Sequence, residues 1–393
     1  MSSLVECMDL DGIVNYSKKI QIYPTKKQKS IFRNWIGTAR VAYNKTVEYL
    51  KQPGTKANWK SIKGEILKSL LEWSKETPYQ IRSIAIRDAC KAISAAKKKF
   101  KLTKVIQKVK FKSRKTPTQS CYIPKSALVS GGIYPTLTGG KIDTVEKLPS
   151  EYGDARLISE KGRWFISISF KQKQLKTESQ GRVVSLDPGI RTFQTFYSEN
   201  SCGKLGEGDF GRIQRLCFYL DKLLSKRKLE KKRLKKLKFK RAIQSIQLKI
   251  RNLIDELHHK VAVFLVKNFD IIILPKFNVS DMVRKGYRKL QSKSVRAMLT
   301  FSHYRFSLFL KHKANEHGKL VLDQSEAYTS KTVSWTGEIV NNLGGKKVIR
   351  SKETGLEMDR DYNGARGIFL RALGDQPFLQ RNLQTTSASD IIS

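Results

Sequence analysis

Two aspartates stand where a folded chain could use them on a phosphate group. Asp187 ends an apolar, β-branched run, and a turn-forming Pro-Gly follows it directly. Asp361 begins a stretch near the C-terminus whose apolar residues recur at helical spacing. Carboxylates of this kind can hold two Mg²⁺ ions over a phosphodiester. We therefore predict that an acid at a strand end and an acid at a helix start share one metal-dependent site for phosphodiester hydrolysis.

The charge of the chain predicts its partner. Its 393 residues include 77 Lys and Arg against 34 Asp and Glu, which gives a formal net charge of +43. A charge this large repels itself in a compact state, so we expect the protein to bind a polyanion, namely nucleic acid. Because 39% of the residues are apolar, the chain can still bury the cores of roughly two or three domains.

Other features of the sequence indicate a reducing compartment and no membrane. No run approaches the roughly 18 apolar residues of a membrane span. Acidic residues precede the first basic ones, unlike the order in a secretory signal. The five cysteines are scattered without a CxxC pair, which is typical of free thiols in a reducing compartment. We predict a protein inside the cell that binds nucleic acid and no membrane.

The densest positive run extends from Lys226 to Arg241. Such a run is commonly a solvated helix face or a nuclear import signal. Apolar residues are spaced through it, so we expect the run to pack on the body of the protein with its cations outward. These apolar residues are Leu229, Leu234, Leu237 and Phe239. Outward cations suit a nucleic-acid backbone, because each neutralised phosphate releases counterions. The predicted binding residues are Lys231, Lys232, Arg233, Lys235 and Lys236.

The first half of the chain predicts a β-barrel interrupted by helices. Residues 18–24 alternate like a strand, and Thr25 then caps a helical pattern. Helical spacing with many lysines continues, so 25–105 is expected to be a helical, basic insert. From 108 to 176, short strands between Gly and Pro turns indicate a small barrel.

The second half predicts a mixed α/β layer in which strands and helices alternate. The expected strands lie at 182–187, 192–197, 271–274 and 319–323. The expected helices lie at 208–230, 240–268, around 292–317 and from Asp361 onward. An acid at the tip of a central strand and another on a late helix suit an RNase H-like layer of this kind.

Short motifs run through nearly the whole chain in an order known from one family. They are Ile20–Thr25 with Gln28, Val184–Thr192, Leu257–Lys260, Phe277–Met282, Glu326–Thr332 and Asp359–Asn363. With these motifs the chain resembles the TnpB/Fanzor superfamily of transposon-associated, RNA-guided DNA nucleases, most of all the compact Fanzor proteins of eukaryotes and viruses. The resemblance implies one protein per omega-RNA-like guide RNA, a DNA target, and cleavage with two Mg²⁺ ions. It implies the nucleus for a protein of a eukaryote or its virus, and the cytoplasm otherwise.

The resemblance also implies a multidomain α/β fold. A RuvC (RNase H-like) nuclease domain is joined to an N-terminal β-barrel wedge domain that carries a helical recognition insert. The implied segments are a wedge barrel at 1–24 and 106–176, a recognition domain at 25–105, a RuvC domain at 181–325 and 357–380, a degenerate zinc-ribbon-like insert for target nucleic acid at 326–356, and a disordered tail at 381–393.

The first departure from the family pattern concerns the third acid of the nuclease centre. The pattern has a glutamate at the end of the second RuvC strand, where this chain has Pro275. Fanzor proteins lose this acid and carry a relocated glutamate, for which Glu326, at the end of the next strand, is the candidate here. Neighbouring strands lie about 4.8 Å apart, so a glutamate can reach the same metal pocket from either one. Glu326 could instead cap the turn that follows it, and the third acid would then be Asp281, Asp323 or Asp359.

The second departure removes a metal site. Relatives carry a four-cysteine zinc ribbon in this part of the chain, and the ligand positions are here Val333, Thr336, Ser351 and Thr354. None of these binds zinc in the usual way, and no cysteine lies nearby, so no zinc is expected. We expect the segment to keep its shape through packing, without the folding energy of a metal, and to be the most mobile part of the nuclease domain.

The resulting hypothesis assigns the catalytic metal ligands to Asp187, Glu326 and Asp361, with Asp187 bridging both ions. Asp359 is the rival of Asp361 and could instead cap the helix. Arg191 and Arg360 flank the carboxylates and could either hold the scissile strand or pair with the acids. A guided DNA-binding protein that no longer cuts is the alternative function, since it would also lose zinc ligands and an acid. A non-specific nucleic-acid chaperone would explain the charge but not the spaced acids.

Overall fold

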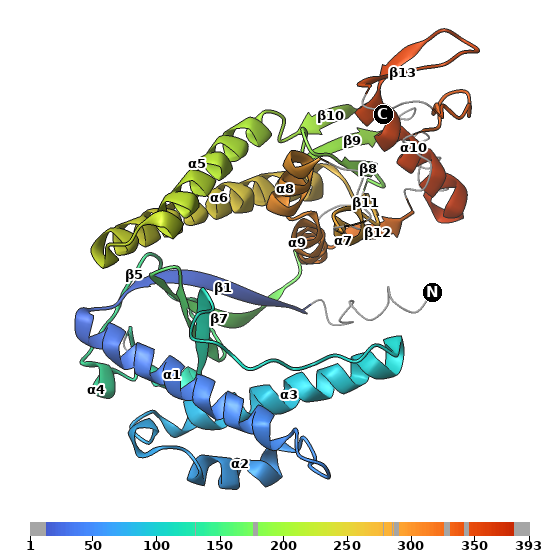
Figure 1. Cartoon of the computed structure of the whole chain (residues 1–393). Coiled ribbons are helices and arrows are strands. Elements are labelled where there is room, and N and C mark those ends of the chain that lie inside the picture. The colour runs from blue at the N-terminus through green and yellow to red at the C-terminus, as the bar shows by residue number, and fades with distance from the viewer. Residues whose placement is uncertain are drawn as a thin grey trace. The chain divides into compact units, whose positions relative to one another are not determined.

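The computed structural model describes residues 13–129, 131–175, 180–277, 279–284, 286, 291–325, 331–341 and 346–380. The chain forms two compact units, one of Asn15–Gln172 and one that combines the residues up to Val14 with those from Lys173 onward (Figure 1). Within the described ranges, no helix is both long enough and apolar enough to cross a lipid bilayer.

The N-terminal unit packs helices on a sheet with the strand order β2-β6-β7-β1-β5. The strands are β1 Ile13–Tyr23, β2 Thr118–Ile123, β5 Asp143–Thr144, β6 Ala155–Glu160 and β7 Arg163–Lys173. The main helices are α1 Lys26–Tyr49, α2 Trp59–Lys68 and α3 Tyr79–Thr103, and the short elements are β3 Leu128–Val129, β4 Gly132–Ile133, α4 Pro135–Thr138 and 3₁₀ turns at Glu72–Ser74 and Lys125–Ala127. Thr25 caps α1, as the sequence predicts, through a reciprocal pair of hydrogen bonds with Gln28.

The small barrel expected for 108–176 is an open sheet in the part of the chain that the structure describes. Its edge strands β2 and β5 pair with β6 and β1 respectively, and they are not paired with each other. β5 pairs only at Ile22 and Tyr23 of β1, so it offers few backbone groups with which a barrel could close.

The C-terminal unit contains a second five-stranded sheet, with the order β10-β9-β8-β11-β12. The strands are β8 Val183–Pro188, β9 Gln194–Ser198, β10 Cys202–Leu205, β11 Ile271–Pro275 and β12 Leu320–Gln324. The helices are α5 Asp209–Leu229, α6 Arg233–Asn268, α7 Val279–Met282, α8 Ser292–Phe301, α9 His303–Glu316 and α10 Arg360–Asp375, and a short hairpin consists of β13 Val348–Arg350 and β14 Glu357–Asp359. β8, β11 and β12 are parallel, whereas β9 and β10 are antiparallel to their neighbours. The alternating strands and helices confirm the predicted mixed α/β layer.

The single helix expected around 292–317 is two helices. α8 ends and α9 begins at Ser302, whose φ of 56° lies in the left-handed region. A residue in this conformation cannot continue a right-handed helix. The break allows Phe301 and Phe306, on either side of it, to enter the same buried core.

Alternate residues of the central strands face two different layers. Val184 and Ile272 lie in a core shared with α6 and α9. Val183 and Ile271 instead pack against α10. Asp187 is an even number of residues from Val183 in β8, so the strand presents its side chain on the α10 face.

Candidate active site

Strand register sets the position of Asp187. Ser185 pairs with Ile273 in the parallel ladder between β8 and β11, so Asp187, two residues on, is level with Pro275. Pro275 in turn pairs with Gln324 of β12. Pro275, at which the resemblance implies a strand-end glutamate in relatives, therefore lies beside Asp187, about 4.8 Å away across the ladder.

Helix α10 brings the second acid to the same edge. Ser185 Oγ donates a 2.7 Å hydrogen bond to the carbonyl oxygen of the fully buried Ala365, which fixes the helix on β8. Gly364 lies against Asp187, because a Cβ at this glycine would be 3.3 Å from the Asp187 Cγ. Asp361 is three residues before Gly364 and so lies on the same side of the helix. Asp187 and Asp361 therefore meet at the edge of the sheet.

Asp359 has a structural role at this helix start. Its Oδ1 accepts a 2.8 Å hydrogen bond from the Asp361 amide and so caps α10. Its Oδ2 accepts a 2.8 Å hydrogen bond from Lys204 Nζ in β10. Burial would raise the pKa of Asp359, but the hydrogen bonds from Lys204 and the amide outweigh burial and lower it. Asp359 is thus an ionised cap.

Asp361 has a different environment. Burial, followed by repulsion from the neighbouring Asp359, raises its pKa above the ordinary value, while the cations Lys204, Arg360 and Arg191 oppose this rise. Asp361 is half-buried and crowded by another carboxylate, so a nearby cation would favour its ionised form.

Both acids line one cleft of about 520 Å³ in the C-terminal unit. The cleft is bordered by the turn after Asp187, by the start of α10, and by Phe277, Met282 and Met298. Its charged wall also contains two further acids, Glu207 and Asp359, and five cations, which are Arg191, Lys204, Lys346, Lys347 and Arg360. Acids at the base of a cation-lined cleft can hold metal ions while the cations face a polyanion.

The other candidates for a third acid have surroundings that differ from those of Asp187 and Asp361. Asp323 is one residue from Gln324, on the opposite face of β12, and pairs with Lys311 of α9 at 2.7 Å. It lies outside the cleft. Asp281 belongs to α7, and its side chain lies outside what the structure describes. Glu326 also lies outside the described residues. Among the residues that are described, no three His, Cys, Asp or Glu side chains gather as a metal site would require.

The predicted basic run lies away from this cleft and forms the turn between α5 and α6. Its five candidate cations, Lys231, Lys232, Arg233, Lys235 and Lys236, are all exposed. The expectation that its apolar residues pack on the body is wrong for three of them, since Leu229, Leu234 and Leu237 are 80%, 75% and 44% exposed. These leucines lie at or near the turn of the helical hairpin, while Phe239 further along packs between the helices.

Sequence reasoning missed three cleft lysines and one glycine. Lys204, Lys346 and Lys347 line the cleft, and Gly364 makes room for Asp187. Gly364 had a sequence signal, because a glycine in a helix interior costs about 1 kcal/mol and needs a packing reason. The lysines had none, since no motif singles them out among the 77 Lys and Arg residues of the chain.

The segment with the degenerate zinc positions has a core and a hydrogen-bonded link instead of ligands. Val333 and Ile349 are buried together, with Trp335 and Met358 packed around them. Glu338 Oε2 accepts hydrogen bonds from Ser351 Oγ at 3.2 Å and from the Lys352 amide at 2.9 Å. One carboxylate therefore joins the two loops that a metal joins in a zinc ribbon.

The same segment is attached to the helix that carries Asp361. Asn363, which is fully buried in α10, accepts a 2.9 Å hydrogen bond from the Ser334 amide and donates a 2.8 Å hydrogen bond to Thr332 O. Arg366 donates a further 3.0 Å hydrogen bond to Ser334 Oγ. α10 thus holds the first loop of this segment next to the cleft.

Comparisons with known proteins agree with this arrangement. Residues 303–368 match the Cas12f1-like TNB domain family, and residues 14–53, which form β1 and α1, match the helix-turn-helix domain of IS605 OrfB proteins. TnpB-like protein L79 of Acanthamoeba polyphaga mimivirus is 25% identical over 90% of this chain and 72% of its own length. By these matches the chain is similar to the TnpB-like (IS605 OrfB) family, which confirms the resemblance seen in its motifs.

Two further comparisons concern a bacterial protein and a solved structure. InsQ of Escherichia coli (strain K12) is 24% identical over 89% of this chain and 90% of its own length. InsQ is named, provisionally, an RNA-guided DNA endonuclease. The fold resembles that of Cas12f1 in its complex with single-guide RNA and target DNA, with a TM-score of 0.54 and 12% identity over 91% of this chain and 99% of that one.

Proposed function

We propose that this TnpB-like protein is an RNA-guided DNA endonuclease that hydrolyses target phosphodiesters in the cleft between β8 and α10. The observation that carries the proposal is that Asp187 and Asp361, 174 residues apart in sequence (361 − 187), line one cation-walled cleft. The similarity to the TnpB-like family and the provisional name of InsQ support guided DNA cleavage as its use.

The residues of the cleft suit Mg²⁺ in kind. Asp187 and Asp361 offer hard carboxylate oxygens. Burial and then repulsion from Asp359 raise the pKa of Asp361, so a bound divalent cation would favour its ionised form. Glu207 and Asp359 also line the cleft, but no three acids gather as a metal site among the described residues, so the proposal takes Glu326 as the third acid. When bound, two Mg²⁺ ions would activate the attacking water and stabilise the leaving oxygen.

Each residue assigned to the cleft has a proposed role. Asp187, Asp361 and Glu326 would be the residues that hold the ions, with Asp187 shared between them. Arg191 and Arg360 border the same cleft, so they are placed to bind the phosphates on either side of the scissile bond. Asp359 and Gly364 hold Asp361 and Asp187 in place without contacting the DNA.

The remaining charge is proposed to hold the nucleic acids. Exposed cations at the turn between α5 and α6 would neutralise backbone phosphates, which gives affinity without sequence preference. We assign the wedge and recognition segments implied by the family to the N-terminal unit, and guide RNA binding to both units. As in Fanzor proteins, the nucleus would be the site of action in a eukaryotic host.

A second function is favoured by one specific observation. Pro275 occupies the position level with Asp187, and no three-acid group exists among the described residues. A chain that lost its third acid without replacement would bind guided DNA and leave it intact.

One experiment separates these functions. The protein is purified with its own guide RNA and incubated with matching plasmid DNA in Mg²⁺ and in EDTA. A nuclease nicks or linearises the matched plasmid only in Mg²⁺, and a scrambled target stays intact. Retention of the matched plasmid without any cleavage in Mg²⁺ would establish the binding protein instead.

A further inference from the structure

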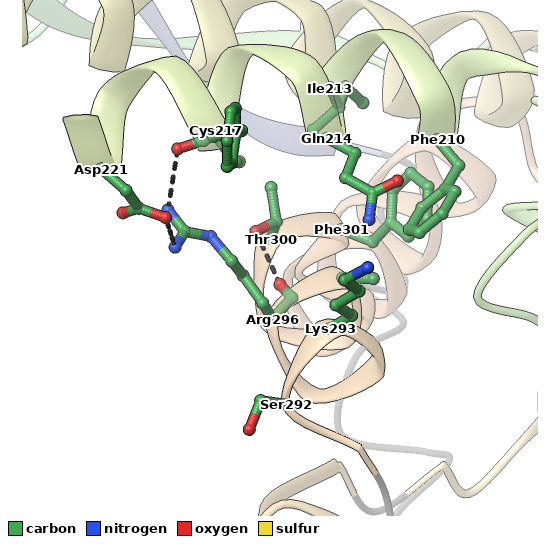
Figure 2. Close-up of a pocket in the computed structure, with 12 residues that line it drawn as sticks. Phe210, Ile213, Gln214, Cys217, Asp221, Ser292, Lys293, Arg296, Thr300 and Phe301 are labelled. Carbon is green, nitrogen blue, oxygen red and sulfur yellow. Dashed lines mark hydrogen bonds and ion pairs between the residues drawn. The ribbon is translucent and has the colours of Figure 1, made fainter.

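A second concave site lies on the C-terminal unit, between α5 and α8. It has a volume of about 270 Å³, and none of its lining residues lines the cleft with Asp187. Its walls are mainly apolar and aromatic, with Phe210, Phe218 and Phe301 as the rings. Figure 2 shows this pocket, with residues of α5 on one side and residues of α8 on the other.

The aromatic side chain Phe218 is placed as a binding surface would be. It is 63% exposed on α5 at the mouth of the pocket, although a phenylalanine gains free energy from burial. Phe301 at the base is buried, with its ring centroid 6.3 Å from that of Phe210. A flat ligand entering here would therefore meet aromatic faces.

Polar groups at the mouth indicate the chemistry of that ligand. Gln214 and Lys293 point toward one another from the two helices (Figure 2). Within the described residues the structure gives the Gln214 amide no hydrogen bond, so it can both donate to and accept from a ligand edge. Lys222 Nζ lies over one face of the Phe218 ring, 4.6 Å from its centroid, which leaves the other face for a stacked ligand and keeps a cation beside it. Arg296 is occupied by an ion pair with Asp221 and shapes the rim.

We infer that this pocket binds an unpaired nucleobase of a single nucleic-acid strand. The aromatic rings can stack on the face of a base, and the Gln214 amide can donate and accept hydrogen bonds at the edge of the base. The nearby lysines can contact the phosphate of the same nucleotide. The formal charge of +43 makes a polyanion the expected partner, and it disfavours a basic or neutral protein segment. The inference rests on the nucleic-acid binding of the proposed function and is independent of cleavage.

The chain offers a matched control in the next residue. Tyr219 is also aromatic, is 53% exposed and belongs to the same helix, but it does not line the pocket. Phe218→Ala and Tyr219→Ala thus remove similar exposed rings, and only the first change affects the pocket. Both positions are exposed, so both variants should fold, which circular dichroism can verify.

The test measures binding of the full chain in EDTA to labelled single strands. Base-bearing RNA, base-bearing DNA and an abasic strand of the same length are compared. Phe218→Ala should weaken binding of one base-bearing strand roughly tenfold, as expected for the loss of one stacked base, and should leave abasic binding unchanged. The strand type that shows the loss identifies whether RNA or DNA is bound. Tyr219→Ala should bind like the wild type.

Two outcomes would overturn the inference. Phe218→Ala could bind every strand as the wild type does, which would assign the pocket to another ligand or to none. Alternatively, it could weaken abasic and base-bearing strands equally, which would show a backbone effect. Photo-crosslinking of 5-iodouracil strands gives a second measurement, since crosslinked peptides should contain Phe218 or Phe210. Cleavage assays on the same variants report the proposed function separately.

Discussion

The carboxylate of Asp187 occupies the space where residue 364 would carry a side chain. A Cβ added to Gly364 would overlap Asp187 Oδ2 and lie 3.3 Å from its Cγ. A strand-end acid and a helix glycine therefore fit together closely, and this fit places Asp187 within one helical turn of Asp361.

Gly364→Ala should consequently damage the active site more than the fold. The added methyl group must displace the Asp187 carboxylate, and a misplacement of about 1 Å can lower a rate about 100-fold. Gly374→Ala is the matched control, because this glycine is in the same helix and a Cβ there meets nothing within 4 Å. Cleavage rates of both variants, measured on guide-matched DNA, test the relationship. Equal rates for the two would show that Asp187 does not need its present position.

Much of this arrangement was predictable from local pattern. The apolar run before Asp187 predicts a strand, and the cap and spacing around Asp359 predict a helix start, because both signals are short-range. The strand neighbours of Asp187 follow from the mixed α/β alternation. The open first sheet and the break at Ser302 were not predictable, because both depend on which distant residues share a core. The lysines Lys346 and Lys347 were missed for the same reason.

Glu326→Gln should abolish cleavage and leave folding and guide binding intact. The amide keeps the shape of the side chain but is a poor ligand for a hard Mg²⁺ ion. The preceding strand supports the proposal, since β12 ends two residues before Glu326 and its Gln324 is level with Pro275 of β11. Cleavage by Glu326→Gln is compared with cleavage by Asp323→Asn, whose acid pairs with Lys311 on the other face. If Glu326→Gln cuts normally, the relocated acid is not Glu326.

Glu338→Ala should loosen the segment that lacks zinc ligands. The change removes the acceptor shared by Ser351 Oγ and the Lys352 amide. Loss of these hydrogen bonds should lower the local opening free energy by about 1–3 kcal/mol. Hydrogen exchange of residues 346–358 provides the measurement, with exposed Glu353→Ala as the control in the same segment. Unchanged exchange in Glu338→Ala would mean that the Val333 and Ile349 core holds the loops alone.

Acid should destabilise the C-terminal unit through two buried histidines. Burial lowers the pKa of His258 to about 4, and burial followed by His258 lowers the pKa of His303 to about 4. The folded pKa is below the unfolded value of 6.5, so the unfolded state binds more protons between these values. The stability contributed by the neutral histidines is complete above pH 6.5 and falls as the pH drops toward 4.

The measurement is the free energy of unfolding between pH 7 and pH 5. Each histidine should make the free energy of unfolding roughly 2 kcal/mol lower at pH 5 than at pH 7. In His303→Phe, the ring packing against Phe193 is kept and one titrating group is lost, so the pH dependence should become shallower. A dependence as steep as that of the wild type would show that His303 does not titrate with unfolding.

The central claim is that Asp187 and Asp361 form one metal-dependent nuclease site. The most direct measurement is Mg²⁺-dependent cleavage of guide-matched DNA by Asp187→Ala and Asp361→Ala, with guide RNA affinity measured in parallel. The account predicts that each variant loses cleavage by about 1,000-fold or more, which corresponds to roughly 4 kcal/mol of lost transition-state stabilisation, while RNA binding stays near the wild-type level. Cleavage by either variant at close to the wild-type rate would contradict it.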